Sequence, residues 1–257
     1  MQSAYTRYLL AAFAAVMFLV ARSPAQQPSS QDQSMRPEHT GHEGMAMDEP
    51  AQIDPAQQRK LLADKKESEF NHHLAGFFVI LAGIFILAER TLSQRWPLVR
   101  FAWPACFLLS GLFLLVYSDT ELWPFGPQSW WYGLTHNLED LQHKTFAVIL
   151  LALGIIEVQR ARGILKSAWA GWVFPVLASC GSLLLLFHEH HTGMHGGGHM
   201  TVMAHIQAEH KSFAAAGFGI GIFKGLSELP ARWNVIFVKL GALLMIVLGV
   251  LLVFYTE

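Results

Sequence analysis

Six apolar runs, each close to 20 residues long, constrain the fold of this chain more than any other feature of its sequence. An α-helix rises about 1.5 Å per residue and a bilayer core is about 30 Å thick, so each run is long enough to cross a membrane. Apolar residues make up 53% of the 257 residues and charged residues only 14%. We therefore predict an all-α, polytopic membrane helix bundle. The six predicted transmembrane helices are residues 70–89, 98–117, 142–160, 169–187, 203–223 and 235–255.

The segment that precedes the first predicted span divides into two parts. Residues 1–25 combine Arg7 ahead of an apolar run with a small-residue cleavage site, which is typical of a signal peptide or, if uncleaved, a signal anchor. Residues 26–69 are rich in Gln, Pro, Ser and charge, so we expect an exported tail that is disordered at first and becomes helical toward its end. A short stretch of this tail contains His39, His42, Met45 and Met47, and a loose metal-capture arm and a merely solvated linker both fit it.

Basic residues are concentrated in alternate links between the predicted spans. They are Arg90, Arg95 and Arg100 after the first span, Arg160, Arg162 and Lys166 after the third, and Lys224 and Arg232 after the fifth. Because positively charged loops stay in the cytoplasm, we place these links inside a bacterial inner membrane. The N-terminal tail, the loop after the fourth span and the C-terminus are then periplasmic. The lipid bilayer is thus an expected partner, and a net charge of −1 argues against nucleic acid.

A His/Met-rich outer loop, residues 188–204, joins the fourth predicted span to the fifth inside the membrane domain, residues 70–257. Imidazole nitrogen and thioether sulfur together suit copper better than hard cations, which prefer oxygen ligands. An accidental polar loop is the alternative. The candidate metal ligands in and directly after this loop are His188, His190, His191, Met194, His195, His199, Met200, Met203, His205, Glu209 and His210. Helical spacing predicts that His205 and Glu209 share one face and that His210 points about 100° away from Glu209.

Three outward helix ends repeat one pattern, in which a polar residue precedes a histidine and a Gly-Ile pair follows at a constant offset. The three histidine and glycine pairs are His72 with Gly83, His143 with Gly154, and His210 with Gly221. We therefore predict three helical hairpins of about 70 residues each, a form of internal repeat common in membrane folds. The repeat places the three histidines at one depth, in the first outer turn of their helices, where they can converge.

A shared metal site would combine these three histidines with His188 and His190, which close the fourth predicted span. His73 and His191 are further candidate ligands. For these two and for His136, however, we favour an interfacial role, with a hydrogen bond to a headgroup or a carbonyl.

Several short motifs of the chain resemble those of the copper-resistance protein D (CopD-like) membrane family. They are Trp123-Pro124-Phe125-Gly126-Pro127, Leu141-Gln142-His143, His188-Glu189-His190 and the helix-opening His210. The resemblance covers roughly residues 70–225, and it implies periplasmic copper handling and uptake across the inner membrane. The His/Met-rich insertion, the N-terminal arm and the presence of only six spans depart from the family's longer members.

Three functions fit the sequence. The first is a copper-binding membrane protein that captures, delivers or helps import Cu(I) or Cu(II), with a periplasmic copper chaperone as a possible partner. The second is a b-type cytochrome-like protein with haem b held by two histidines. The third is a non-catalytic scaffold subunit. The spans carry few polar groups at mid-membrane, so we favour binding and delivery over full transport. No nucleophile–base pair indicates an enzyme, although a redox role stays open.

Overall fold

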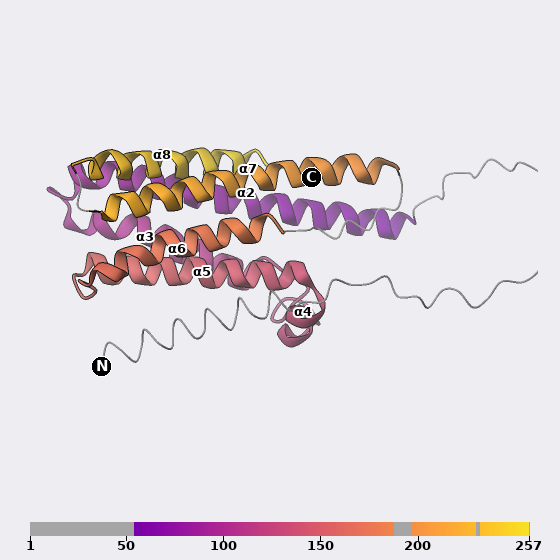
Figure 1. The fold of residues 1–257 in the computed structure, drawn as a ribbon. Helices are drawn as coiled ribbons and strands as arrows, with labels where there is room; N and C mark the ends of the chain where they lie inside the picture. Colours follow the sequence, from indigo (N-terminus) through magenta and orange to yellow (C-terminus); the bar gives the residue numbers. More distant parts are fainter. Residues whose placement is uncertain (1–53, 188–196, 230–231, 257) are drawn as a thin grey trace, which may run out of the picture. The chain divides into compact units, whose positions relative to one another are not determined.

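The computed structural model describes residues 54–187, 197–229 and 232–256, and throughout these residues the regular structure is helical. The predicted signal peptide and residues 26–53 of the predicted tail lie outside the described residues. The helices are α2 Pro55–Leu92, the 3-10 helix η1 Pro97–Phe101, α3 Ala102–Tyr117, α4 Trp130–His136, α5 Leu138–Ala161, α6 Ala168–Leu185, α7 Gly197–Glu228 and α8 Asn234–Val253 (Figure 1). The predicted all-α fold class is therefore confirmed.

Five helical stretches are long and apolar enough to cross a membrane, among the residues the structure describes. They are Gln58–Leu92, Pro97–Tyr117, Leu138–Ala161, Ala168–Leu185 and Asn234–Val253. The chain is thus a multi-pass membrane protein by length and composition. The remaining predicted span, 203–223, lies within α7, which is 32 residues long but is not one of these five. Glycines and charged side chains lower the mean hydropathy of α7, so its crossing of the membrane stays a prediction.

The helices that carry the three repeated histidines begin earlier than predicted. Because α2 starts at Pro55 and α7 at Gly197, His72 and His210 lie well inside their helices. Their predicted place in a first outer turn was therefore wrong. The reason is that the polar segment before His72 is itself a good helix former, rich in Ala, Gln, Leu, Lys and Glu. An ion pair between Lys65 and Glu69, which lie one helical turn apart with their charged atoms at 3.6 Å, further stabilises this helical segment.

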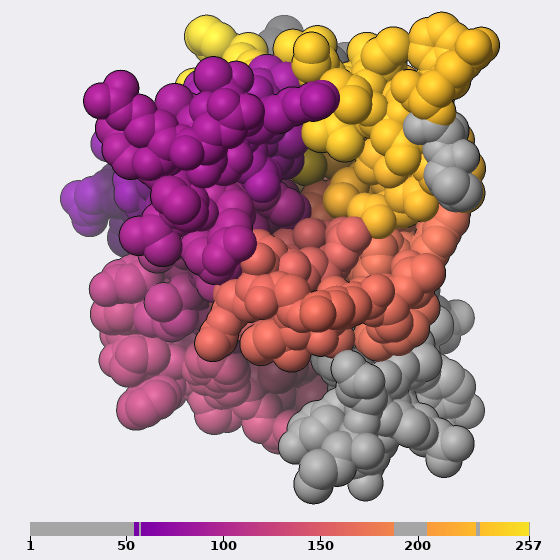
Figure 2. All heavy atoms as spheres, turned by 90° about the vertical axis from the view of Figure 1, so that its left-hand side faces the viewer, coloured from indigo at the N-terminus to yellow at the C-terminus, as the bar shows by residue number. Residues whose placement is uncertain are grey.

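Successive long helices run in opposite directions, so the links between them alternate between the two ends of the bundle (Figure 1). The α2–α3, α5–α6 and α7–α8 links share one end, and Figure 2 shows their segments side by side on that face. These are the three links with the basic residues. Ion pairs at this end join α5 to α7, because Arg160 contacts both Glu157 at 2.9 Å and Glu228 at 2.7 Å.

Six long helices form a closed ring. Neighbours in the chain pack together from α5 through α8, and α3 packs on α5. The ring closes through α2, which touches α3 by a hydrogen bond from Asn71 to the Ser118 carbonyl and touches α8 at Gly76 and Gly83. All six helices line one internal cavity. The centre of the bundle is therefore hollow toward the end opposite the basic links.

Close approach of backbones in the ring occurs at the three glycines of the sequence pattern. A Cβ atom on Gly83 would lie 2.7 Å from the Ala242 carbonyl oxygen of α8. One on Gly154 would lie 3.0 Å from the Pro104 carbonyl oxygen of α3. One on Gly221 would lie 3.1 Å from a carbonyl oxygen of α6, that of Pro175. Each glycine thus lets its helix sit directly against the backbone of a neighbour.

Candidate functional site

The cavity lined by the six helices has a volume of about 220 Å³. Its wall is mostly apolar, with Phe107, Phe174 and Phe213 among the residues that line it. Polar side chains gather toward one end, where His72, His143 and His210 line it together. The structure therefore brings to one cavity the three histidines that the repeat pattern singled out, each from a different helix.

Backbone carbonyl groups fix the orientation of two of these rings. His72 Nδ1 lies 2.8 Å from the Ser68 carbonyl oxygen, and His210 Nδ1 lies 2.8 Å from that of Ile206, one helical turn earlier in each case. A carbonyl oxygen only accepts hydrogen bonds, so each ring must carry a proton on Nδ1. In the neutral ring the lone pair is then on Nε2. Metal-ligating histidines commonly have this arrangement, because the bond at one nitrogen orients the other.

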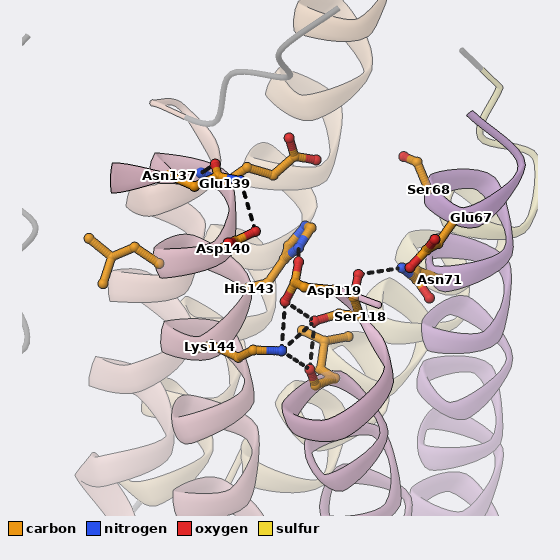
Figure 3. Close-up of polar contacts among 12 residues, drawn as sticks. Glu67, Ser68, Asn71, Ser118, Asp119, Asn137, Glu139, Asp140, His143 and Lys144 are labelled. Atoms are coloured by element: carbon orange, nitrogen blue, oxygen red, sulfur yellow. Dashed lines mark hydrogen bonds and ion pairs between the residues drawn. The ribbon is translucent and has the colours of Figure 1, made fainter. Parts of the chain in front are cut away.

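A carboxylate takes the place of the carbonyl group for the third ring. His143 Nδ1 donates to Asp119 Oδ1 at 2.7 Å, and the Lys144 ammonium lies 2.6 Å from Asp119 Oδ2 (Figure 3). The Ser118 hydroxyl lies 2.6 Å from the same Oδ2 atom. Asp119 directly follows α3, whereas His143 and Lys144 are neighbours on α5. The Asp119 carboxylate therefore ties these two helices together and holds the His143 ring.

The charge state of Asp119 follows from these contacts. Burial alone would raise the pKa of this carboxyl, because only 6% of its side chain is exposed. The hydrogen bond from His143 and the positive charge of Lys144 outweigh burial and hold the pKa of Asp119 below its ordinary value. Asp119 is therefore ionised at neutral pH and accepts hydrogen bonds from its neighbours.

Aromatic contacts connect the rings from α2 and α7. The ring centroids of His72 and His210 lie 5.9 Å apart at an interplanar angle of 86°. Tyr255, which is fully buried just after α8, stacks on His72 at 4.1 Å and meets His210 edge-on at 5.8 Å. Tyr255 therefore helps to set the distance between the two imidazoles.

Other predicted histidines do not line the cavity. His73 Nε2 lies 3.0 Å from the Tyr255 carbonyl oxygen, the kind of carbonyl contact favoured for it from sequence. His136 is on α4 and stacks against Tyr132. His205 pairs with Glu209 at 3.6 Å, as their spacing of four residues predicts, but more than half of the His205 side chain is exposed. His72, His143 and His210 therefore line the cavity, whereas His73, His136 and His205 do not.

The remaining candidate ligands were predicted from the loop between α6 and α7. His188, His190, His191, Met194 and His195 lie outside the described residues. His199, Met200 and Met203 belong to α7, but their side chains are outside the described part of the structure. Their proposed role as ligands therefore stays a prediction.

Asp119, Lys144, Ser118 and Asn71 were not among the predicted site residues. Asp119 lies in the short polar link after the second predicted span, where a carboxylate is expected to be solvated and gives no sign of a buried role. A usable signal was Lys144, a charged residue directly after a histidine at the start of an apolar helix, because such a residue needs a buried partner. Its partner, 25 positions earlier in the chain, has no local spacing to reveal it.

Within the part of the chain that the structure describes, no group of three or more His, Cys, Asp or Glu side chains is close enough to hold a metal ion. His72, His143 and His210 share a cavity without forming a complete metal site by themselves. The chain matches no family model, no curated protein and no solved structure. The function proposed below therefore depends on the residues that line the cavity.

Proposed function

We propose that this chain is a copper-binding protein of the bacterial inner membrane that captures copper at the end of its helix bundle, for delivery or import. The observation that supports this most directly is the cavity that His72, His143 and His210 line together. Each ring is held through Nδ1, which orients Nε2 for coordination. The resemblance to the copper-resistance protein D family points to the same chemistry.

The types of ligand atom available, imidazole nitrogen and thioether sulfur, are those that copper prefers. Imidazole binds both Cu(I) and Cu(II), and the thioether groups predicted in the loop favour Cu(I). The three described histidines do not complete a metal site. We propose that residues 188–204, which begin just after α6, supply the other ligands. Copper is cargo in this proposal, and the protein contributes the oriented rings and the His143–Asp119 pair.

Protons compete with copper for these ligands. Only the neutral ring has a lone pair for the metal, and the ordinary pKa of a histidine is about 6.5. Copper affinity should therefore fall as pH drops through this range. Titration of the detergent-purified protein with copper at about pH 7.5 and about pH 5 measures this. Equal affinity at both values would argue against histidine ligation.

Substitution of the cavity histidines tests which rings take part. His72→Ala, His143→Ala and His210→Ala should each weaken copper binding more than tenfold, since each removes a ligand rather than its outer support. His136→Ala is the matched control, because His136 is on α4 and does not line the cavity. Copper content measured by elemental analysis should stay at the wild-type level in this control. Loss of copper in all four variants would indicate damage to the fold instead.

Haem b is the second candidate ligand, favoured by one observation. His72 and His210 lie on different helices with ring centroids 5.9 Å apart, next to an apolar cavity. Two histidines from facing helices are a common way to hold haem. A visible spectrum distinguishes the two proposals, because a Soret band in the purified protein indicates haem and its absence leaves copper.

The same proposal includes the orientation and the internal repeat. The three basic links share one end of the bundle, which we place in the cytoplasm, so the histidines face the periplasm. The contacts of Gly83, Gly154 and Gly221 support three repeated hairpins. Each glycine meets the second helix of another hairpin, and the three contacts follow one another around the ring.

A further inference from the structure

The cavity extends far beyond the layer of the three histidines. On α5 its lining runs from His143 to Leu153, and on α7 from His210 to Ile220. At a rise of about 1.5 Å per residue, both helices give a cavity length of about 15 Å. The copper proposal uses only one end of this space. Because the whole cavity has a volume of only about 220 Å³ over this length, it is long and narrow.

The chemistry of the wall restricts what can occupy this space. None of the described residues that line it carries a carboxylate, an ammonium or a guanidinium group. A charged headgroup or the carboxylates of a haem would therefore find no ionic partner there. The polar groups on the wall are hydroxyl, amide and imidazole, which bind uncharged oxygen groups by hydrogen bonds.

A hydroxyl group deep in the cavity indicates that the occupant carries oxygen. Ser110 lies on α3, two helical turns below Ser118, and only 2% of it is exposed. A buried serine in a membrane helix ordinarily bonds the carbonyl one turn earlier, as Ser182 does with Ala178. The Ser110 hydroxyl instead finds no hydrogen-bond partner among the described residues, although it lines the cavity. A buried hydroxyl in this position needs a partner from the occupant.

We propose that the cavity binds a membrane quinone. A quinone is an uncharged, flat ring with oxygen groups on opposite sides and a long apolar chain. Ser110 would bond one ring oxygen at depth, the polar layer near His143 would bond another, and the phenylalanines would pack against the ring and chain. An acyl chain would leave Ser110 without a partner. This inference depends on the length, charge and depth of the cavity, and it is independent of copper.

Substitutions on α6 test the occupancy. Gly181 lines the cavity, and a Cβ atom there would lie 3.5 Å from Phe146, an ordinary contact. The first side-chain atom is therefore accommodated at this position, and the rest of the leucine in Gly181→Leu should occupy part of the cavity. Organic extraction of the purified protein, followed by ultraviolet and mass spectra, should find a quinone in the wild type and at least tenfold less in Gly181→Leu. Leu183→Phe is the control, because Leu183 is exposed and does not line the cavity, and it should keep the wild-type amount.

Ser110→Ala keeps the fold and removes one hydrogen bond, so it should weaken binding of an added short-chain benzoquinone roughly three- to tenfold. Copper titration separates the two proposals, because Ser110 lies two helical turns below Ser118 and Ser110→Ala should bind copper within twofold of the wild type. Equal quinone content in the wild type and Gly181→Leu, or phospholipid alone in the extract, overturns the quinone proposal. A Soret band would identify haem as the occupant instead. A failure of copper binding together with retained quinone would overturn only the proposed function.

Discussion

Three imidazole rings on three helices line one cavity, and each has a hydrogen-bond partner at Nδ1. For His72 and His210 the partner is a carbonyl group of the same helix, so helix formation alone orients the ring. For His143 it is Asp119, which comes from another part of the chain. The orientation of His143 therefore depends on tertiary structure, and it is the ring most sensitive to changes elsewhere.

Asp119→Asn should weaken copper binding by roughly 10- to 100-fold, the usual effect of removing the carboxylate behind a ligating histidine. The substitution also leaves the buried Lys144 without its ion-pair partner. The double variant Asp119→Asn/Lys144→Gln removes both charges and serves as the control. Copper titration of both variants is the measurement. A double variant that regains wild-type affinity would mean that Asp119 acts through Lys144 and not through His143.

The same substitution should affect stability in a pH-dependent way. Because the pKa of Asp119 is lowered in the folded protein, the carboxylate stabilises the fold above its unfolded value of about 3.9. This contribution is lost as pH falls through the lower folded value. At neutral pH, Asp119→Asn should cost roughly 3 to 5 kcal/mol, because it breaks a buried pair. Thermal unfolding in detergent should show that this difference shrinks below about pH 4 and persists at pH 7.

Glycine contacts determine how closely neighbouring helices approach. Gly83→Ala would bring a methyl group within 2.7 Å of a backbone oxygen of α8. A backbone atom cannot rotate away as a side chain can, so the two helices would have to move apart. We expect a loss of roughly 1 to 3 kcal/mol in unfolding free energy. Gly181→Ala is the matched control, with a nearest contact of 3.5 Å, and it should cause no loss. Equal stability of the two variants in detergent unfolding would show that the α2–α8 contact is looser than described.

Ion pairs at the opposite end join the helices by charge. Burial alone would raise the pKa of Glu228, but Lys224 and Arg160 outweigh it and lower this pKa. Glu228→Gln removes the partner of both cations and should cost roughly 1 to 3 kcal/mol. Lys65→Gln breaks an exposed pair one turn apart and should cost at most about 0.5 kcal/mol. Thermal unfolding of the two variants side by side measures the difference, and similar losses would contradict a special role for Glu228.

Helix positions could be predicted more readily than side-chain partners. Apolar runs placed α5 and α8 within a few residues, because hydrophobicity over 20 residues is a local property. The extension of α2 to Pro55 was only partly anticipated, since helix propensity in a polar segment is a weaker signal. The convergence of the histidines was suggested by the repeated pattern. The Asp119–Lys144 pair and the hollow centre depend on contacts between distant segments, which no periodicity in a single chain reveals.

At the scale of the whole molecule, the orientation in the membrane can be tested directly. The charge of the three basic links predicts that they are cytoplasmic. Alkaline phosphatase fused after residue 256 should therefore be active, and the same enzyme inserted at residue 164, in the α5–α6 link, should be inactive. Green fluorescent protein at the same two sites should give the opposite pattern. Activity of the enzyme at residue 164 would reverse the predicted orientation and place the histidines on the cytoplasmic side.

The contact between α2 and α8 joins the first and last helices of the bundle. Because α8 is synthesised last, the glycine-bearing face of α2 has no α8 to pack against until the end of synthesis. The cavity lacks one of its six walls before that moment. The cavity is therefore completed only when α8 packs against α2 at Gly76 and Gly83, so any resident molecule must be bound after the last helix is in place.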